Sequence, residues 1–261
     1  MRYAPIALAI VFVWRPAFAL EASPNSTPKI ANKVLWAWRR PENLTSIDKR
    51  EFAVAYLACH AFVVGAKVNV QWRDQPLRIP AGTVVIPTVR IDVLRNKKPV
   101  LAEDQLNTLA HVISRAAKVP QAGMVQIDFD ALQSERPFYR QLIKRIRNDL
   151  PPDMPISITA LASWCLFDNW MKDLPVEETV PMMFSLGKDR EKILRYFRAG
   201  KDFLDERSRR TLGLSLDDTE INDVMIPLAR ARKMPVRIYI FTRTAWTGKK
   251  IQQLRSLPHY L

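Results

Sequence analysis

Eight short apolar segments, most of them separated by stretches of helical periodicity, predict an α/β protein folded as a (β/α)8 TIM-like barrel. Strands that alternate with helices form parallel sheets, and eight such units close into a barrel. The spacing is irregular between residues 38 and 84, so we expect the first units to be degraded. An open doubly wound sheet, which shows the same alternation, is the alternative. The apolar segments lie near residues 34, 54, 84, 124, 156, 178, 212 and 236.

The first part of the predicted barrel contains more strand than helix. Residues 34–38 form a short apolar strand that ends before Pro41. The apolar run 52–64 and the alternating run 67–73 flank Gly65, which predicts a strand followed by a hairpin.

In the middle of the chain, segments with the periodicity of strands alternate regularly with segments that have the periodicity of helices. Its clearest helix carries apolar side chains on one face and is stopped by Pro151 and Pro152. The predicted elements are strand 83–90, helix 103–118, strand 124–129, helix 136–150 and strand 156–161.

The last part continues the alternation. Pro181 interrupts one strand, Gly200 ends one helix, and Asp217-Asp218 is placed to cap another. The predicted elements are strand 176–184, helix 189–199, strand 212–216, helix 218–232 and strand 236–241.

The N-terminus has the pattern of an export signal. Arg2 precedes an apolar segment too short to span a bilayer, and Ala17-Phe18-Ala19 has the small-x-small form of a cleavage site. We therefore expect a signal peptide over 1–19, a linker over 20–32 and a single barrel domain over 33–261. The protein would be periplasmic or secreted, with no stable membrane span after cleavage; an uncleaved N-terminal anchor is the alternative.

The composition excludes several classes of site. With 7 Gly, the chain has no GxGxxG or GxxxxGK[ST] loop, which argues against the corresponding nucleotide chemistry. HExxH and CxxC spacings do not occur, so we expect no metal and no cofactor. Cys59 and Cys165 both lie in apolar contexts, where buried free thiols are favoured over a disulfide.

The net charge of +14 arises largely from helical segments, where spaced charges usually form a solvated face. A basic surface favours anionic polymers by general electrostatics. No basic, aromatic-interleaved motif of the nucleic-acid modules occurs, so we expect no nucleic-acid partner.

The apolar strand 124–129 brings two carboxylates to one place. Asp128 and Asp130 are two residues apart, so on a strand they point to the same face. Two like charges on one face raise at least one pKa, which prepares a carboxylic acid for proton transfer. We expect these two residues to be catalytic, with Asp92 as a further candidate carboxylate.

Other polar and aromatic residues follow the predicted strands and would meet at the same mouth of the barrel. Indole faces stack on sugar C–H surfaces, while arginines and carboxylates bind hydroxyl groups, so this mixture is typical of carbohydrate sites. Glycoside hydrolysis needs two carboxyl groups. The expected substrate-binding residues are Arg90, Trp38, Trp164, Arg243 and Trp246.

Each of these features also has a structural interpretation. Arg90 and Asp130 could form an ion pair at the barrel top without a catalytic role. Trp36 and Trp38 could pack in the core, and Asp217-Asp218 is better explained as a helix cap.

Several segments between about residues 34 and 187 together resemble the DUF3142 family of uncharacterised exported bacterial proteins. That resemblance implies an exported barrel similar in layout to glycosidase barrels, without an established reaction. The segments are 36–42 (WAWRRPE), 54–58 (VAYLA), 75–80 (QPLRIP), 89–92 (VRID), 125–131 (VQIDFDA), Phe138-Tyr139, 158–165 (ITALASWC) and 174–182 (LPVEETVPM).

A more distant similarity is to chitinase-like barrels, whose fourth strand carries D-x-D-x-E. Asp128 and Asp130 match the two aspartates, but Leu132 stands where the acid glutamate would be, and Glu135 lies three residues further on. This departure argues against chitinase-type chemistry.

These observations favour a glycoside-hydrolase-like barrel that acts on a carbohydrate polymer, which the basic surface suggests could be anionic. The alternative is a non-catalytic barrel in the cell envelope that binds a glycan or another partner. The absence of a glutamate at position 132 favours the alternative, as would a pocket in which Arg90 binds both Asp128 and Asp130.

Overall fold

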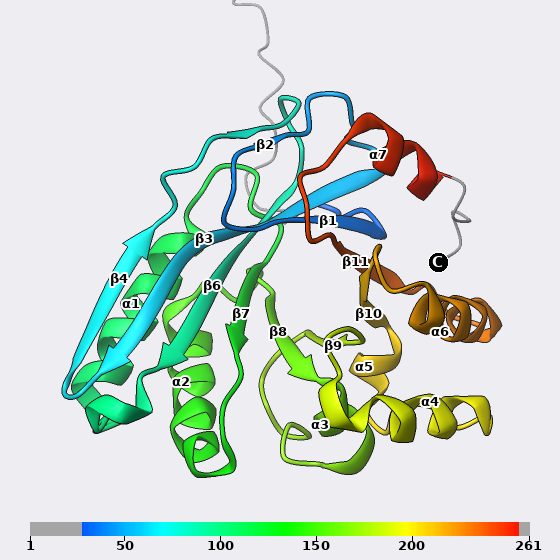
Figure 1. Cartoon of the computed structure of the whole chain (residues 1–261). Helices are drawn as coiled ribbons and strands as arrows, with labels where there is room; N and C mark the ends of the chain where they lie inside the picture. The colour runs from blue at the N-terminus through cyan, green and yellow to red at the C-terminus, as the bar shows by residue number, and fades with distance from the viewer. Residues whose placement is uncertain (1–27, 256–261) are drawn as a thin grey trace, which may run out of the picture.

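The computed structural model describes residues 28–255 and shows a closed barrel of eight parallel strands (Figure 1). The strand order is β1-β11-β10-β9-β8-β7-β6-β3, and β1 also pairs with β3, which closes the ring. The predicted (β/α)8 barrel is confirmed, and the open sheet is wrong. The barrel strands are β1 Lys33–Ala37, β3 Phe52–Val64, β6 Val85–Val93, β7 Val125–Phe129, β8 Ile156–Leu161, β9 Glu178–Met182, β10 Thr211–Ser215 and β11 Arg237–Phe241.

Helices pack around the outside of the strands (Figure 1). The four predicted helices are confirmed to within a residue at each end, whereas α3, α5 and α7 were not predicted. The α-helices are α1 Glu103–Ala117, α2 Arg136–Asp149, α3 Ala162–Phe167, α4 Arg190–Arg198, α5 Glu206–Arg209, α6 Thr219–Ala231 and α7 Gly248–Arg255. Short 3-10 helices occur at Arg95–Lys97, Gln133–Glu135 and Gly187–Asp189.

The first units are irregular, as expected. No helix connects β1 to β3; instead β2 (Glu42–Asn43) pairs with β5 (Leu77–Arg78) in a separate small sheet. Strand β4 (Lys67–Trp72) pairs antiparallel with the outer half of β3, and the turn between them contains Gly65 at a φ of 55°. The predicted hairpin is therefore confirmed, and it extends the barrel wall outward.

Apolar side chains form two cores, one between strands and helices and one inside the barrel. The inner core is small and includes Trp36, Ile86, Met124 and Tyr239. Polar side chains cross it as well, because Gln126 accepts a hydrogen bond from the Trp36 indole at 3.2 Å and donates one to Ser157 at 3.1 Å. Alternating side chains of each parallel strand thus fill both cores.

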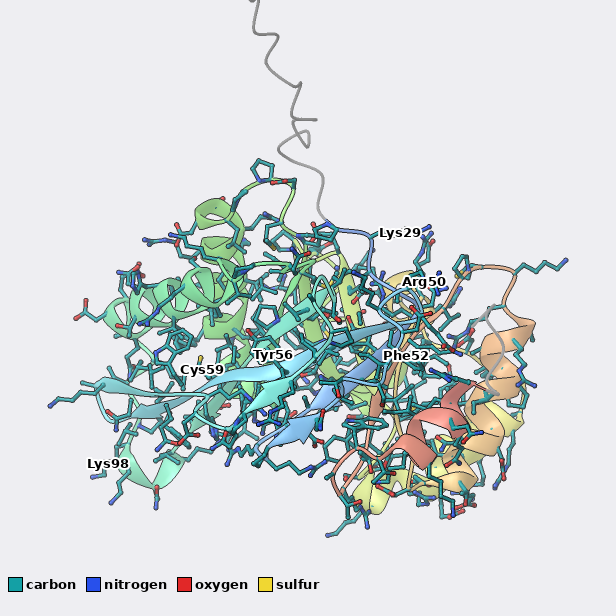
Figure 2. All side chains as sticks on the ribbon, turned by 90° about the horizontal axis from the view of Figure 1, so that it is seen from above. Lys29, Arg50, Phe52, Tyr56, Cys59 and Lys98 are labelled. Carbon is teal, nitrogen blue, oxygen red and sulfur yellow. The ribbon has the colours of Figure 1, made fainter. Side chains whose placement is uncertain are left out.

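A bulge in β3 decides which of its residues face the barrel mouth. The register with β6 shifts between Leu57 and Cys59, so Ala58 is an extra residue that reverses the alternation of side chains. Cys59 joins the outer core as a result, and His60 turns to the same face as Arg90. Figure 2 follows this strand from Phe52 through Tyr56 to Cys59.

Both cysteines are buried free thiols, which confirms the interpretation favoured from the sequence. Burial raises the pKa of Cys59 and that of Cys165 to about 12. Both side chains therefore stay protonated and act as small apolar groups of the outer core.

The predicted signal peptide over 1–19 and most of the linker lie outside the described residues. Across residues 28–255, no helix combines the length and the apolar character needed to cross a bilayer.

Candidate functional site

A cavity of about 280 Å³ opens at the C-terminal ends of the barrel strands. Residues from β1, β6, β7, β8, β9 and β11, or from just beyond them, contribute to its wall. This mouth is the end of the barrel at which the side chains of several strands converge. The cavity is lined by Trp36, Trp38, Arg90, Asp128, Asp130, Leu161, Met182, Phe184, Ser185 and Phe241.

One wall of this mouth cavity is aromatic. Phe184 and Phe241 stack with ring centroids 5.2 Å apart and an interplanar angle of 8°. Trp36 meets the edge of Phe184 at 6.2 Å and is only 2% exposed, so it forms the floor. Trp38 is half-buried and lines the cavity without a ring partner among the described residues. The structural interpretation therefore holds for Trp36, whereas Trp38 has an indole face available to a ligand.

The opposite wall is built on the guanidinium of Arg90, which contacts three carboxylates. Its Nη1 donates to Asp128 Oδ2 at 2.9 Å, and its Nη2 lies 2.9 Å from Asp130 Oδ2. Its Nε donates to Asp92 Oδ1 at 3.0 Å. The side chains lie together because Arg90 pairs with Asp128 in the register of β6 and β7, and the carboxylates of Asp128 and Asp130 both contact Arg90.

Burial is the main influence on the pKa of Asp128. Its carboxyl is 6% exposed, and removal from water raises its pKa, while the charge of Arg90 and a hydrogen bond from Thr159 Oγ1 at 2.7 Å act in the opposite direction. The charge of Arg90 therefore lowers the pKa of Asp128, but the desolvation of the carboxyl is the larger effect.

The pKa of Asp92 is shifted in the opposite direction from that of Asp128. The hydrogen bond with His60, together with the charge of Arg90, lowers the pKa of Asp92 to about 2. His60 Nε2 lies 2.6 Å from Asp92 Oδ2, and Arg39 donates to His60 Nδ1. With Arg39 donating to Nδ1, the Nε2–H of His60 is the donor to Asp92. Arg90, Asp92, Asp128 and Asp130 together form what we call the Arg90 cluster. Asp92 belongs to this cluster but does not line the mouth cavity.

Few carboxylate oxygens of this cluster are free to act on a ligand. Both oxygens of Asp128 accept hydrogen bonds from protein groups, and so do both oxygens of Asp92. Asp130 differs, because only its Oδ2 contacts Arg90 and its side chain is 45% exposed. Asp130 Oδ1 is therefore the one carboxylate oxygen of the three side chains that has no partner within the described part of the chain.

No glutamate replaces the acid that is missing at position 132. Leu132 is 50% exposed, and Glu135 is buried and paired with Arg95, whose Nη2 lies 2.8 Å from Glu135 Oε2. The same oxygen accepts a hydrogen bond from the Leu132 backbone N–H at 2.8 Å. Glu135 thus holds the loop after β7, and both of its oxygens are used.

Three of the expected substrate-binding residues lie away from the mouth cavity. Trp164 lies in the first turn of α3 and packs edge-on against Trp170 in the outer core. Trp246 is 5% exposed, and its indole N–H donates to the Trp36 carbonyl at 2.9 Å. Arg243 is exposed, and its backbone N–H donates to Asp217. These side chains follow their strands by two residues or more, where the chain has already turned outward.

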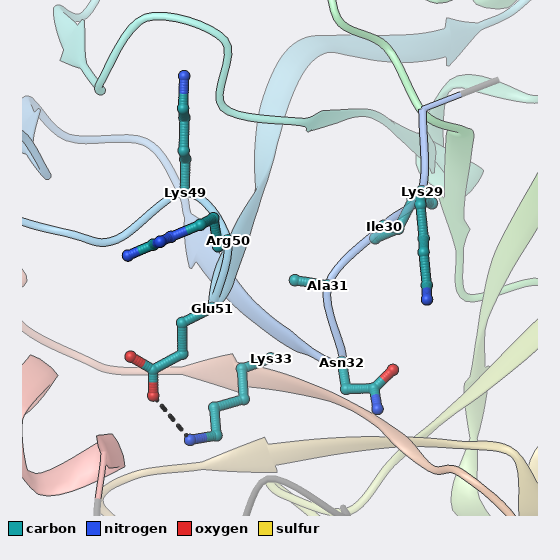
Figure 3. Close-up of a pocket in the computed structure, with 8 residues that line it drawn as sticks. All are labelled: Lys29, Ile30, Ala31, Asn32, Lys33, Lys49, Arg50 and Glu51. Atoms are coloured by element: carbon teal, nitrogen blue, oxygen red, sulfur yellow. Dashed lines mark hydrogen bonds and ion pairs between the residues drawn. The ribbon is translucent and has the colours of Figure 1, made fainter. Parts of the chain in front are cut away.

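A second cavity, of about 340 Å³, lies near the N-terminal ends of β1 and β3 (Figure 3). Lys29, Lys49 and Arg50 surround it on exposed side chains, and the Nζ of Lys33 pairs with Glu51 at 3.0 Å. Exposed cations of this kind form a solvated surface, and they do not assemble a binding site for one ligand.

Within residues 28–255, His, Cys, Asp and Glu side chains do not form a group of three or more suited to a metal ion. The three aspartates of the Arg90 cluster converge on a guanidinium, which supplies the positive charge at that point.

No family model and no curated protein sequence matches the chain. Among solved structures, the spore cortex-lytic enzyme SleL of Bacillus cereus matches with a TM-score of 0.44 and 13% identity, over 74% of this chain and 52% of that one. The chitinase domain of the spore coat protein CotE from Clostridium difficile matches with a TM-score of 0.43 and 13% identity, over 87% of this chain and 68% of that one. The chain thus spans about half the length of the SleL structure.

Proposed function

We propose that this barrel binds a carbohydrate polymer in its mouth cavity. The observation that carries the proposal is the pairing of aromatic rings with hydrogen-bonding charged groups across one cavity of about 280 Å³. The Trp38 indole supplies a flat apolar face for sugar C–H groups, while Arg90 and Asp130 supply donors and an acceptor for hydroxyls. A ligand that is apolar on its faces and polar at its edges fits this arrangement.

The Arg90 cluster favours binding over turnover. Glycoside hydrolysis requires one carboxyl to protonate the leaving group and another to act as nucleophile or base. Asp128 and Asp92 use both oxygens in protein contacts, which leaves Asp130 Oδ1 as the free oxygen of the cluster. A single available carboxylate oxygen suits hydroxyl recognition better than it suits a two-carboxyl reaction.

Trp38→Ala on a glycan array tests this proposal. We expect the native protein to retain particular polysaccharides and Trp38→Ala to lose at least about tenfold in affinity, because the variant lacks the stacking face. Phe167→Ala is the matched control, since Phe167 is 43% exposed and does not line the mouth cavity. Equal binding by the native protein and Trp38→Ala would reject this site, and no binding by the native protein would reject the function.

Glycoside hydrolysis is the second candidate function, and Asp130 is the observation in its favour. Its half-exposed carboxylate lies beside Asp128, whose pKa is raised by burial. If the protein hydrolyses a glycan, release of reducing ends should fall at least about a thousandfold in Asp130→Asn, the scale expected when a catalytic carboxyl is removed. Full release by a folded Asp130→Asn variant would exclude that role.

We also propose that the protein acts outside the cytoplasm, as the export-like N-terminus and the DUF3142 resemblance suggest. The net charge of +14 would favour anionic polymers there. An epitope-tagged full-length protein found in the periplasmic or secreted fraction would support this location, and one confined to the cytoplasm would contradict it.

A further inference from the structure

A third cavity, of about 540 Å³, lies on the outer part of the barrel wall next to the Arg90 cluster. We propose that it is a second carbohydrate subsite, so that one polymer chain runs from the mouth cavity across Asp92 into this outer cavity. The inference rests on the proposed function and deepens it, because it assigns where further sugar residues of the polymer bind. Residues that line the outer cavity include Arg39, Leu57, His60, Gln71, Trp72 and Arg73.

The strand register joins the two cavities. Gln71 of β4 pairs with His60 of β3, His60 pairs with Arg90 of β6, and Arg90 pairs with Asp128 of β7. Four polar side chains therefore form one row across four neighbouring strands. At the usual spacing of about 4.8 Å between strands, the row is roughly 14 Å long, which exceeds the width of one sugar ring.

This row lies on the face of the sheet opposite α1, here called the open face. Residues Cys59, Ala61 and Val63 alternate with His60 along β3, and they pack in the outer core together with α1. Figure 1 shows α1 behind the extension formed by β3, β4 and β6. The bulge at Ala58 is what directs His60 to the open face.

The open face offers the groups that sugars need. Gln71 is exposed, and its amide has no partner among residues 28–255, so it can both donate to and accept from hydroxyls. Phe62 is half-buried and its ring centroid lies 3.8 Å from that of His60. Asp92, with a 36% exposed carboxylate, lies between the two cavities and contacts both Arg90 and His60. The amide of Gln71, the carboxylate of Asp92 and the ring of Phe62 are thus the same kinds of group, polar and aromatic, that line the mouth cavity.

The outer cavity is also held in shape before any ligand binds. Arg73 donates to the backbone carbonyls of Gln75 at 2.9 Å and Arg40 at 2.7 Å, and it also contacts the Trp38 carbonyl. These bonds tie the segment after β4 to the segment after β1, which carries Trp38 and Arg39. A cavity fixed in this way loses little conformational entropy when it binds a chain.

The test is an array that carries length-graded chitin, cellulose, xylan and peptidoglycan oligosaccharides, probed with the native protein and two variants. Gln71→Ala removes a group of the outer cavity alone, and the double variant Gln71→Ala/Arg39→Ala also removes the side chain that donates to His60 Nδ1. We expect native affinity to rise with chain length, and the double variant to lose about tenfold on long chains and nothing on disaccharides. Gln252→Ala on α7 is the matched control, because this glutamine is exposed and lies outside both cavities.

The outcomes separate this inference from the proposed function. Native binding that is independent of chain length, or a length preference unchanged in folded Gln71→Ala, would overturn the second subsite and leave the mouth site standing. A native protein that binds no glycan would overturn both. Thermal unfolding of each variant establishes that it is folded. If the double variant does not fold, the length preference of Gln71→Ala alone tests the second subsite.

Discussion

At the scale of single residues, Arg90 determines which carboxylate oxygens of the candidate site are available to a ligand. Its guanidinium faces three carboxylates, one buried and two partly exposed. A buried carboxylate is costly without a counter-charge, whereas Asp92 and Asp130 retain contact with water. Arg90 therefore stabilises the mouth chiefly through Asp128, and it leaves Asp130 Oδ1 available to a ligand.

Replacing Arg90 should destabilise the protein in a pH-dependent way. Arg90→Met leaves Asp128 buried without a counter-charge, so we expect a loss of about 3 kcal/mol in the free energy of unfolding at about pH 7. The raised pKa of Asp128 means that its ionisation disfavours the folded state. Its contribution to stability is therefore complete below the unfolded pKa and is lost as pH rises through the folded pKa. Urea denaturation should show a smaller deficit at about pH 4.

The double variant Arg90→Met/Asp128→Asn is the control for that interpretation. Its neutral amide no longer needs a counter-charge, so we expect it to be more stable than Arg90→Met at about pH 7. A double variant no more stable than Arg90→Met would show that Arg90 acts by packing alone.

Asp92 should contribute stability with the opposite dependence on pH. Its hydrogen bond with His60 lowers its pKa from 3.8 to about 2, so its contribution is present above the unfolded pKa and is lost as pH falls through about 2. Because the carboxyl is 36% exposed, we expect Asp92→Asn to cost only about 1 kcal/mol at about pH 7 and nothing near the acid limit. Asp173→Asn, at an exposed position, is the matched control in urea titrations across this range. A constant deficit at every pH would contradict this assignment.

Predictions for single residues were correct where the alternation of a regular strand alone determines which way a side chain points. Asp128 and Asp130 share a face and meet Arg90, because all three lie on or next to regular strands with no bulge between them. His60 was not predicted, since the bulge at Ala58 that turns it to the same face as Arg90 has no clear sequence signal. Trp164 and Trp246 were predicted to lie at the mouth because they follow strands. The direction of the loop and the side-chain rotamer determine where such a side chain points, and neither can be predicted from the position of a residue after a strand.

At the scale of elements, a capping side chain marks the start of α6. Asp218, expected as an N-cap, accepts a hydrogen bond from the Ile221 backbone N–H, and both of its oxygens also bind Arg190 at 2.8 Å. The helices with strong apolar periodicity were predicted, whereas α3 and α5 were not. These two have six and four residues, too few to show a period, and tertiary contacts hold them in place.

Removing the cap of α6 should cost a measurable part of the stability. We expect Asp218→Ala to lower the free energy of unfolding by about 1–2 kcal/mol, because it removes both the cap and the partner of Arg190. Asp223→Ala on the same helix is exposed and serves as the matched control, without an expected loss. Urea denaturation of the two variants measures the difference, and equal stabilities would contradict a capping role for Asp218.

At the scale of the whole molecule, closure of the barrel is what creates the site. The pairing of β1 with both β11 and β3 places Trp38, which follows the first strand, near residues that lie far away in the sequence. The count of eight apolar segments, together with the resemblance to glycosidase-like barrels, favoured this closure over an open sheet. The sequence also predicted the hairpin of β3 and β4, but not that the outer half of β3 extends beyond the closed barrel, because a long apolar strand has the same pattern in both places.

The central claim is that the mouth of the barrel binds carbohydrate polymers without hydrolysing them. The most direct measurement applies the native protein and Asp130→Asn to the same polysaccharide panel and reads retention and reducing-end release together. We expect both proteins to be retained by the same polysaccharides, within about threefold in affinity because the amide still accepts hydrogen bonds, and neither to release reducing ends. Release by the native protein that disappears in folded Asp130→Asn would contradict this claim and identify a glycosidase.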